Sequence, residues 1–454
     1  MRTEIERGEA PPRAATVPRE RRWALALMLA ITTCAFIDRA ILNTVGQAIR
    51  DDLKLSDLQL GLLGGAAFSI LYGTLGIPVA RWAERSDRIG IVSIAVTIWS
   101  SMTMLCAMAT GFWQLLLMRI GVGVGEAGAN APVQSYLSDL YPPERRGTVV
   151  GILGLSVPLG IIIGGIGGAW VAQHHGWRMA FLLVGLPGLV LAAAARLTLR
   201  DKRPPVAKAE IPSLRTVLAT LWESRSFRQM IAGGVVTSFI GQAVLAFGHP
   251  FFVRNFGLSY TEAAVYFALV NGASVAGGYM VGGFVVDRFV TRDVRYYGWI
   301  PALMMLLAGP FYIAGFLQRE LLPGLILLAI PGVFSASYYA PVLAVTQNIV
   351  ASRMRATAIS IVLLAMNIIG LLLGPLTAGA LSDFYFAQAL PAGIDAAACR
   401  AAMTALCEAA SARGVSYALA TICLLFLWSA VHYFAASRHL ERDIDFQQQQ
   451  DGNP

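Results

Sequence analysis

The sequence FIDRAI at residues 36–41 decides the fold, because a second copy, FIGQAV, follows at residues 239–244. The same offset along the chain pairs Leu55-Ser56 with Leu258-Ser259. Further matches keep the same order. Ala80, Glu84 and Arg85 pair with Gly283, Asp287 and Arg288. Ala131–Val133 then pairs with Ala340–Val342, and Arg146 and Thr148 pair with Arg355 and Thr357. Colinear matches of this kind indicate two related halves.

The composition places these halves in a membrane. Of the 454 residues, 56% are hydrophobic and 14% are charged, whereas about a quarter of the residues in soluble proteins are charged. A membrane-spanning helix takes about 20 apolar residues. We therefore expect an all-α membrane protein with twelve transmembrane helices in two six-helix pseudo-repeats. The apolar runs are 22–45, 58–80, 89–109, 113–138, 147–172, 178–199, 228–252, 261–286, 296–317, 321–349, 356–384 and 414–436.

The positive charges indicate the orientation of the chain. Of the 35 Lys and Arg residues, about 25 fall in one alternating set of loops and about seven in the other. Loops rich in Lys and Arg face the cytoplasm, so both termini are expected there. The net charge of +8 then reflects orientation, and we expect no nucleic-acid partner. Short loops and the lack of an N-x-Ser/Thr acceptor favour a bacterial inner membrane.

The linker between the halves sets the domain boundaries, and its segment 213–222 is expected to lie as an amphipathic helix on the inner leaflet. Cys399 and Cys407 share a loop, where a disulfide and two free thiols are both open readings. The predicted divisions are a cytoplasmic tail at 1-21, an N-terminal bundle at 22-199, the linker at 200-227, a C-terminal bundle at 228-437 and a second cytoplasmic tail at 438-454.

Four charged residues within the apolar runs mark the candidate functional site. A charge at the centre of a span costs about 2.5–3.5 kcal/mol on insertion scales, and the second half lacks all four charges. Adjacent residues point about 100° apart on a helix, so the first acid and the first base need different partners. The four residues are Asp38, Arg39, Arg119 and Glu126, and their counterparts are Gly241, Gln242, Leu328 and Ser335.

Two explanations of these charges remain open. In the first, buried ion pairs fix the packing of the helices. In the second, Asp38 and Glu126 carry protons, while Arg39 and Arg119 act as their partners or bind an anionic head group.

The remaining motifs do not indicate catalysis. GVGEAG at 123–128 matches the dinucleotide fingerprint, but it lies in an apolar span rather than in a βαβ unit, so we assign its glycines to helix packing. His174-His175 lacks the spacing of metal ligands. We therefore expect no enzyme, no catalytic residue, no cofactor and no metal. A membrane acyl- or phosphotransferase lacks a visible catalytic constellation, and a channel is disfavoured because the charges lie on one half.

Charged residues in two corresponding loops are candidates for a cytoplasmic gate. They would form an ionic latch that breaks and reforms as the halves rock; the alternative is that they only set the topology. The residues are Arg81, Glu84, Arg85, Arg88, Asp287 and Arg288.

Over nearly its whole length, the chain resembles the major facilitator superfamily. The Glu84-Arg85 and Asp287-Arg288 loops are similar to that superfamily's loop motif, although the first copy has Ala80 and Glu84 where glycine and aspartate are usual. Arg119-x-x-x-Gly123 is similar to its fourth-span motif, which is associated with proton coupling. Within the superfamily, FIDR at 36–39, DLKLSD at 52–57, Glu126 and PPER at 142–145 resemble the Spinster family.

The Spinster resemblance implies transport of lysolipids or sphingolipids, such as lysophospholipids or sphingosine-1-phosphate. We expect a proton-coupled, alternating-access carrier that is monomeric and takes an amphiphilic lipid-like substrate, protons and membrane lipids as its partners. The alternative is a proton-driven multidrug or organic-anion exporter of the same superfamily. Candidate residues that line the cavity are Phe68, Tyr72, Tyr136, Phe251, Asn271, Ser335, Tyr338, Tyr339 and Asn367.

Overall fold

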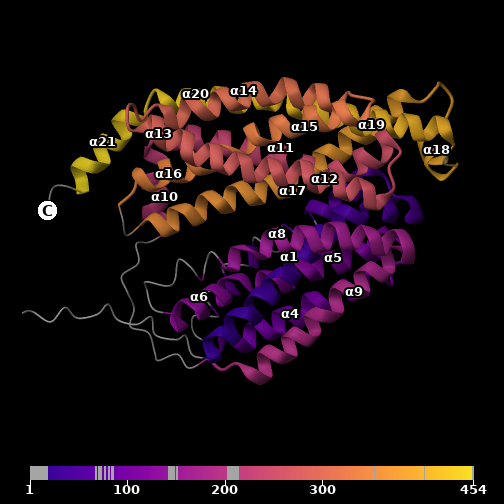
Figure 1. Cartoon of the computed structure of the whole chain (residues 1–454), viewed down its shortest axis with the longest axis horizontal. Coiled ribbons are helices and arrows are strands. Elements are labelled where there is room, and N and C mark those ends of the chain that lie inside the picture. The colour runs from indigo at the N-terminus through magenta and orange to yellow at the C-terminus, as the bar shows by residue number, and fades with distance from the viewer. Residues whose placement is uncertain are drawn as a thin grey trace, which may run out of the picture.

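A computed structural model describes residues 19–451, apart from 67–68, 70–73, 76–77, 80–81, 83–85, 142–148, 150–151, 202–213, 352–353 and 403. The described residues form helices and contain no strand. Two bundles lie side by side in Figure 1, with the N-terminal half below in indigo to magenta and the C-terminal half above, ending in yellow. The division into two helical halves agrees with the repeat in the sequence.

The N-terminal half opens with its longest helix, which carries the FIDRAI sequence. Two of its spans contain π-helical turns at glycines, over Leu62–Ala66 and Ile163–Gly167. The α-helices of this half are α1 (Arg19–Leu53), α2 (Asp57–Gly61), α4 (Arg88–Cys106), α5 (Phe112–Ala127), α6 (Asn130–Leu140), α8 (Ser156–Ile162) and α9 (Gly168–Thr198).

The linker helix α10 (Leu214–Glu223) leads into the C-terminal half. A π-helical turn over Val281–Val285 joins two of the helices of this half. Its helices are α11 (Arg225–Phe256), α12 (Tyr260–Met280), α13 (Val286–Val290), α14 (Tyr296–Phe316), α15 (Leu321–Ala336), α16 (Tyr339–Asn348), α17 (Arg355–Ala389), α18 (Ala396–Ala402), α19 (Ala405–Cys423), α20 (Leu425–Ser437) and α21 (Leu440–Asp451).

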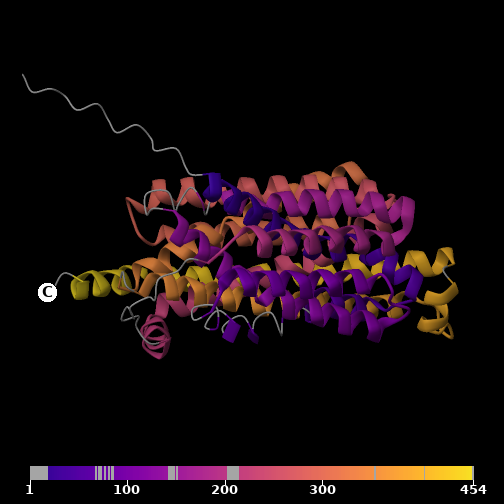
Figure 2. The ribbon, with the colours of Figure 1, turned by 90° about the horizontal axis from the view of Figure 1, so that it is seen from below.

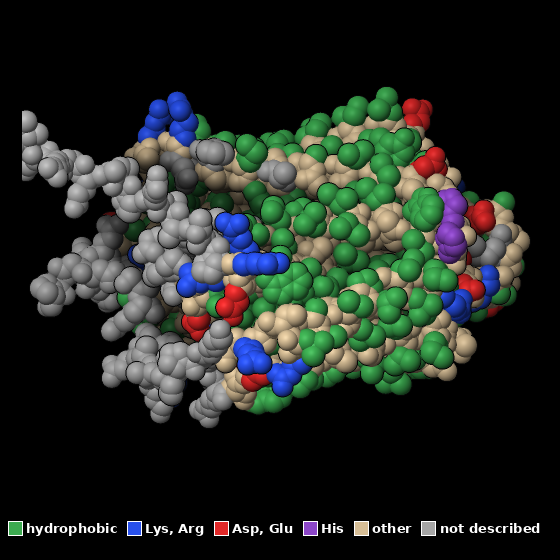
Figure 3. All heavy atoms as spheres, turned by 60° about the horizontal axis from the view of Figure 1, so that its bottom comes forward, with side chains coloured by type: hydrophobic (Ala, Val, Ile, Leu, Met, Phe, Trp, Pro, Cys, Tyr) green, Lys and Arg blue, Asp and Glu red, His purple; other side chains and the backbone are tan. Residues whose placement is uncertain are grey.

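Nine helical stretches among the described residues are long and apolar enough to span a membrane. One of them, Ile152–Thr198, covers two predicted runs. Gly176, with a φ of 82°, breaks the helix between these two runs. The fourth run divides into α5 and α6 at Gly128, and the second is described mainly at its start. Figure 3 shows hydrophobic side chains along one face of the molecule and charged side chains towards its two ends. The all-α membrane fold is thus confirmed.

Two capping boxes explain why the sequence repeats at the second span of each half. The Ser56 hydroxyl accepts a hydrogen bond from the Gln59 amide at the start of α2, and the Gln59 side chain accepts one from the Ser56 amide. Ser259 and Glu262 form the same arrangement at the start of α12. A capping box satisfies amide groups that a helix leaves unpaired at its N-terminus. The paired Leu-Ser sequences therefore begin equivalent helices.

The two ends of the molecule carry different features. We call the end with α10 and α21 the linker end; α21 and the C-terminus project from it in Figure 2. We call the opposite end, with α18, the disulfide end, because a disulfide joins Cys399 to Cys407 there with a Cα–Cα distance of 5.6 Å. The structure thus pairs the two cysteines whose state the sequence leaves open.

The two halves pack closely at the disulfide end. A Cβ on Gly61 or Gly65 would meet backbone oxygens of α17, those of Pro375 and Leu371, and a Cβ on Gly379 would meet the Asp57 backbone. Glycine permits this approach because it has no Cβ, as at other helix contacts in membranes. Toward the linker end the ribbons of the two halves diverge (Figure 1). The protein is therefore closed at the disulfide end.

Candidate substrate and proton site

Asp38 lies in the middle of α1 and is only 1% exposed. Its Oδ2 accepts a hydrogen bond of 3.2 Å from Nη1 of Arg119 on α5. Its Oδ1 accepts one of 2.6 Å from the hydroxyl of Thr103 on α4. Removing either charge would leave the other buried and uncompensated. The Asp38–Arg119 pair therefore ties α1, α4 and α5 together.

Arg39 turns to a different partner, as its position beside Asp38 on the helix requires. Its Nε donates a hydrogen bond of 2.7 Å to Oε2 of Glu126 on α5, and its second terminal nitrogen lies 2.7 Å from the same oxygen. The guanidinium carbon lies 5.3 Å from the centre of the Phe36 ring, within the range of a cation–π interaction. The four predicted charges thus form two neutral pairs.

The two pairs differ in their access to solvent. The Arg39 side chain is 30% exposed, whereas the Glu126 side chain is 1% exposed. A ligand can therefore reach Arg39 while Glu126 stays covered. Oε1 of Glu126 and Nε of Arg119 are buried, and neither atom has a hydrogen-bond partner among the described residues. A buried polar atom without a partner is costly, and only Oε2 of the two Glu126 oxygens has a described partner.

The counterparts of these residues in the C-terminal half carry no charge and therefore form no ion pair. A Cβ on Gly241 would meet nothing within 4 Å. Leu328 packs against Gly315, and Ser335 donates to the carbonyl of Gly332 on its own helix. The structure is therefore asymmetric: all four charges of the candidate site come from the N-terminal half.

Tyrosines form the most distinctive group of predicted cavity residues. Tyr338 and Tyr339 lie at the start of α16, and the ring of Tyr339 stacks on that of Tyr279 with centroids 5.1 Å apart. Tyr338 also contacts Tyr433 of α20. The sequence analysis did not single out Tyr279 or Tyr433, which lie inside the apolar runs 261–286 and 414–436 and contact these two tyrosines. Partly exposed Asn271 and exposed Asn367 complete the set of described polar candidates.

Two of the predicted cavity residues instead pack inside their own halves. Phe251 is fully buried and meets Phe252, Phe256 and Phe316 edge to face at centroid distances of 5.1–5.7 Å. Tyr136 is buried in the core of the N-terminal half. Neither lines a cavity in this conformation, because an apolar run does not reveal which helix face meets a neighbouring helix. Phe68 and Tyr72 lie outside the described residues.

The candidate gate is only partly described. Arg81, Glu84 and Arg85, and the side chain of Asp287, lie outside the described residues, while Arg288 is exposed.

Arg88 makes its described ion pairs within the N-terminal half and with the start of the linker in this conformation, so whether it joins the latch in the opposite state stays a prediction. It forms a two-pronged ion pair with Asp201, at 2.7 and 2.9 Å, and contacts Asp139 at 2.6 Å. It therefore fixes the ends of α4, α6 and α9 relative to one another.

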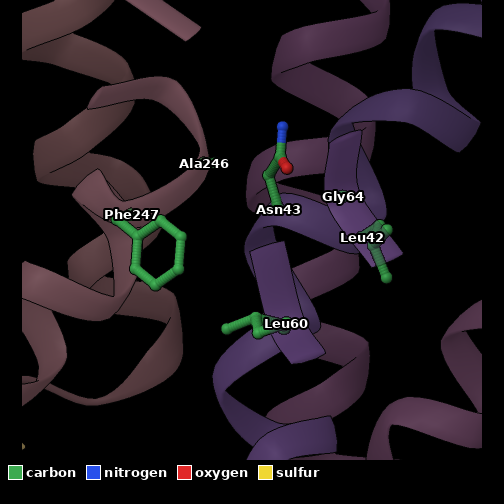
Figure 4. A pocket seen from close by; sticks show the side chains of 7 residues that line it. Leu42, Asn43, Leu60, Gly64, Ala246 and Phe247 are labelled. Carbon is green, nitrogen blue, oxygen red and sulfur yellow. The ribbon is translucent and has the colours of Figure 1, made fainter. Parts of the chain in front are cut away.

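A small pocket lies between the halves (Figure 4). It is lined from the N-terminal half by Asn43 and Leu60, among others, and from α11 by Ala246 and Phe247. Leu60 belongs to the same buried cluster as Phe247, so it inserts into the C-terminal half. Asn43 lies one helical turn beyond Arg39 toward the disulfide end. The pocket therefore lies about one helical turn from Arg39, on the side of the disulfide end.

A second charged group, which the sequence analysis missed, joins the halves at the disulfide end. Arg254 of α11 forms a two-pronged ion pair with Asp57, at 2.6 and 2.7 Å, and Arg50 of α1 lies 2.8 Å from the same carboxylate. Asp383 of α17 accepts hydrogen bonds from the amides of Asp57 and Leu58. We call Arg50, Asp57, Arg254, Asp383 and Arg400 the disulfide-end network; Arg400 lies 3.1 Å from Asp383.

Asp57 stays ionised in this network. Its burial alone would raise the pKa of the carboxyl, but Arg254 and Arg50 outweigh burial and hold the pKa below its ordinary value. The contact between the halves is therefore a true ion pair over the whole physiological range of pH.

Comparisons with known proteins agree with this architecture. The model of the Major Facilitator Superfamily matches residues 28–375. An MFS-type efflux pump of Mycolicibacterium smegmatis is 31% identical over 365 residues, which cover 80% of this chain and 85% of that protein. Protein spinster homolog 1 of Xenopus tropicalis is 27% identical over 240 residues, covering 50% of this chain and 45% of that one.

Two solved structures of a bacterial homolog of the human lysosomal transporter Spinster, both inward-facing, are also similar. The unoccupied form has a TM-score of 0.85 and 30% identity, and the occupied form has 0.82 and 31%. Each comparison covers 94% of this chain and 98% of the other. The chain belongs to the Major Facilitator Superfamily. It is a Spinster-like secondary transporter, an integral membrane protein and not an enzyme.

Proposed function

We propose that this transporter is a proton-coupled carrier of a lysolipid or sphingolipid-like amphiphile. The observation that carries the proposal is the Arg39–Glu126 pair, in which a partly exposed cation holds a buried carboxylate. An anionic head group that binds Arg39 competes with Glu126 for the same guanidinium. Without Arg39, burial favours the neutral form of Glu126, so a proton binds. Head group and proton therefore occupy the site together.

Asp38 has a different part in this proposal. Its carboxylate keeps Arg119 and Thr103 as partners and is closed to ligands. We propose that the Asp38–Arg119 pair fixes α5 against α1, so that Glu126 stays within hydrogen-bond distance of Arg39. Asp38 accepts a proton only in a conformation that separates it from Arg119.

The apolar surroundings of the site support an amphiphilic substrate. The pocket beyond Arg39 is lined by Leu42, Leu60 and Phe247 as well as by Asn43, and Tyr338 and Tyr339 line the proposed cavity from the C-terminal half. A cation beside an apolar wall suits a molecule with an anionic head and one acyl or alkyl tail. Two of the similar proteins are named as probable sphingolipid transporters of Arabidopsis thaliana.

A second candidate function is the export of drugs or organic anions. It is favoured by the similarity to the MFS-type efflux pump, which extends over 85% of that protein. The two functions differ in their substrates. An exporter of this kind transports soluble dyes in competition with drugs, whereas a lysolipid carrier discriminates by the acyl chain.

We place the linker end in the cytoplasm of a bacterial cell, in the inner membrane and with both chain termini inside, because that end carries most of the Lys and Arg residues. The closed disulfide end then faces outward, so this conformation is inward-facing. The proposed monomer has the domain divisions predicted from the sequence. The Asp287-Arg288 loop and the loop at 81–88 remain our candidates for the latch that closes the inner side in the opposite state.

Transport in proteoliposomes tests the proposal. The wild-type protein is expected to move a radiolabelled lysophospholipid faster when a pH gradient is imposed, and Glu126→Gln is expected to abolish this stimulation. Glu262→Gln, an exposed carboxylate at the disulfide end, is the matched control and should respond like the wild type. Undiminished stimulation in Glu126→Gln would reject proton coupling through this residue.

A further inference from the structure

The disulfide-end network holds its most deeply buried cation with partners from the opposite half of the molecule. Arg254 belongs to the C-terminal half, and its side chain is 5% exposed. Its Nε donates to Oε1 of Gln47 at 2.8 Å, and its terminal nitrogens donate to both oxygens of Asp57. Gln47 and Asp57 both belong to the N-terminal half. Arg254 must therefore lose these hydrogen bonds when the halves separate at this end.

Separation would also leave the groups of this network, taken together with Asp51, with opposite net charge on the two sides. On the N-terminal side, Arg50 remains with Asp57 and Asp51, which lies 3.3 Å from it. This side then holds one cation and two anions. On the C-terminal side, Arg254 and Arg400 remain with the single carboxylate of Asp383, and Arg400 already contacts that carboxylate. The C-terminal side would therefore attract an anion and the N-terminal side would repel one.

A polar stripe on α1 links the candidate site to this network. Arg39, Asn43, Gln47 and Arg50 follow one another at intervals of one helical turn, so they share one face of α1. Arg39 and Arg50 are 11 positions apart, or about 16 Å along the helix. Asn43 lines the pocket between the halves, and Gln47 contacts Arg254. The stripe therefore runs from Arg39 to the position of Arg254, beside the apolar wall that Figure 4 shows.

From this arrangement, and resting on the function proposed above, we infer that Arg254 is a second binding site for the substrate's anionic head group. In the inward-facing state Asp57 occupies the guanidinium and closes the outer side. In the outward-facing state a phosphate or carboxylate head group takes the place of Asp57, and the tail lies between the separated halves against apolar residues such as Leu60 and Phe247, which line the small pocket in this structure. Arg254 thus serves in turn as a lock, the ion pair with Asp57 that holds the outer side closed, and as the outer substrate site.

Binding to the purified full-length protein in detergent tests this inference. The probes are a monoacyl glycerophosphate, whose head is anionic, and the uncharged monoacylglycerol with the same chain. Asp57→Asn and Arg254→Lys both disrupt the two-pronged ion pair but keep a cation at position 254, whereas Arg254→Gln disrupts the pair and removes the cation. The matched control, Arg178→Gln, removes an arginine that pairs with Asp52 at the same end.

We expect Asp57→Asn and Arg254→Lys to bind the anionic probe at least as tightly as the control. Arg254→Gln should bind it about tenfold or more weakly, because one charge-assisted contact is lost. All variants should bind the uncharged probe alike. If Asp57→Asn and Arg254→Gln weaken binding of the anionic probe equally, Arg254 is a lock only and the inference is wrong. Using both Asp57→Asn and Arg254→Lys keeps the test valid if one of them misfolds.

Inorganic phosphate serves as a third probe and separates a lipid head group from a free anion. We expect it to compete weakly, because it lacks the apolar tail. Displacement of the lipid probe by an equal concentration of inorganic phosphate would contradict the assignment to an amphiphile. No proton gradient enters these measurements, so a failure of proton coupling at Glu126 leaves their outcome unaffected.

Discussion

At the scale of single residues, two neighbouring positions on α1 have different tasks because they face different surroundings. Asp38 is enclosed with Arg119, while Arg39 reaches both Glu126 and solvent. We propose that the buried Asp38–Arg119 pair is an anchor, whereas the partly exposed Arg39–Glu126 pair is an exchangeable contact. The sequence predicted that the two residues need different partners, but it could not predict which pair would be sealed, since exposure depends on how α4 and α5 pack.

This difference predicts that neutralising Asp38 lowers the free energy of unfolding more than neutralising Glu126 does. Asp38→Asn leaves Arg119 buried without a counter-charge, which costs about 3–5 kcal/mol in comparable buried pairs. Glu126→Gln is expected to cost less, because the partly exposed Arg39 can turn toward water. Thermal unfolding of the two purified variants in one detergent compares them, with Glu262→Gln as the control. Equal melting temperatures for Asp38→Asn and Glu126→Gln would contradict the division into anchor and exchangeable contact.

At the scale of helices, the contact between α2 and α17 joins the two halves at the closed end, and we propose that it controls the outer closure. The capping box at Ser56 starts α2 beside Asp383, and Gly61 then lets the helix lie against the Pro375 backbone. Because this contact joins the two halves, opening of the disulfide end is expected to break it. A side chain at Gly61 is thus expected to act on one of the two transport states.

Gly61→Ala is predicted to favour the outward-facing state. Overpacking of a close contact costs about 1–3 kcal/mol, which shifts the equilibrium between the states by about fivefold or more. A cysteine introduced at Asn43, in a background without Cys34, Cys106 and Cys423, reports the change as faster labelling by a membrane-impermeant thiol reagent from the outer side.

Gly167→Ala is the control for this substitution, because a Cβ on Gly167 meets nothing within 4 Å. It should label at the rate of the parent protein. A Gly61→Ala protein that labels no faster than Gly167→Ala would show that the α2–α17 contact does not control closure.

The repeat predicted the helices better than it predicted the contacts between them. Ser56 and Ser259 were paired in the sequence, and both begin helices with the same capping box. The sequence analysis named Asp57 only within the DLKLSD motif and did not single out Arg254, because their contact joins residues 197 positions apart. Phe251 was misplaced for the related reason that an apolar residue suits a cavity wall and a helix interface equally well.

At the scale of the whole molecule, the outer closure should not respond to physiological pH. The pKa of Asp57 is lowered in the folded protein, so its ion pairs are fully present above the unfolded value of about 3.9 and are lost only as the pH falls through the lower, folded value. Any pH dependence of transport between pH 5 and 8 must therefore arise elsewhere, and we assign it to the candidate site.

Spin labels at Lys54 and Arg319, which are exposed at the disulfide end of the two halves, measure this closure. Without substrate, their distance distribution is expected to stay the same from pH 5 to pH 8. Asp57→Asn should broaden it toward longer distances at every pH. A widening on mild acidification in the wild type would mean that protonation itself opens the outer side.

We propose that alternating access in this molecule rests on the exchange of arginine partners. In this proposal Arg39 exchanges Glu126 for a head group on the inner side, and Arg254 exchanges Asp57 for the same group on the outer side. The first exchange is the central claim, because it couples the substrate to the proton.

Proton uptake on substrate binding tests that claim most directly. A monoacyl glycerophosphate is added to the purified protein in weakly buffered detergent solution with a pH indicator. The account predicts uptake of about one proton per bound lipid by the wild type, and none by Glu126→Gln. Lipid binding to the wild type without proton uptake, or equal uptake by Glu126→Gln, would contradict it.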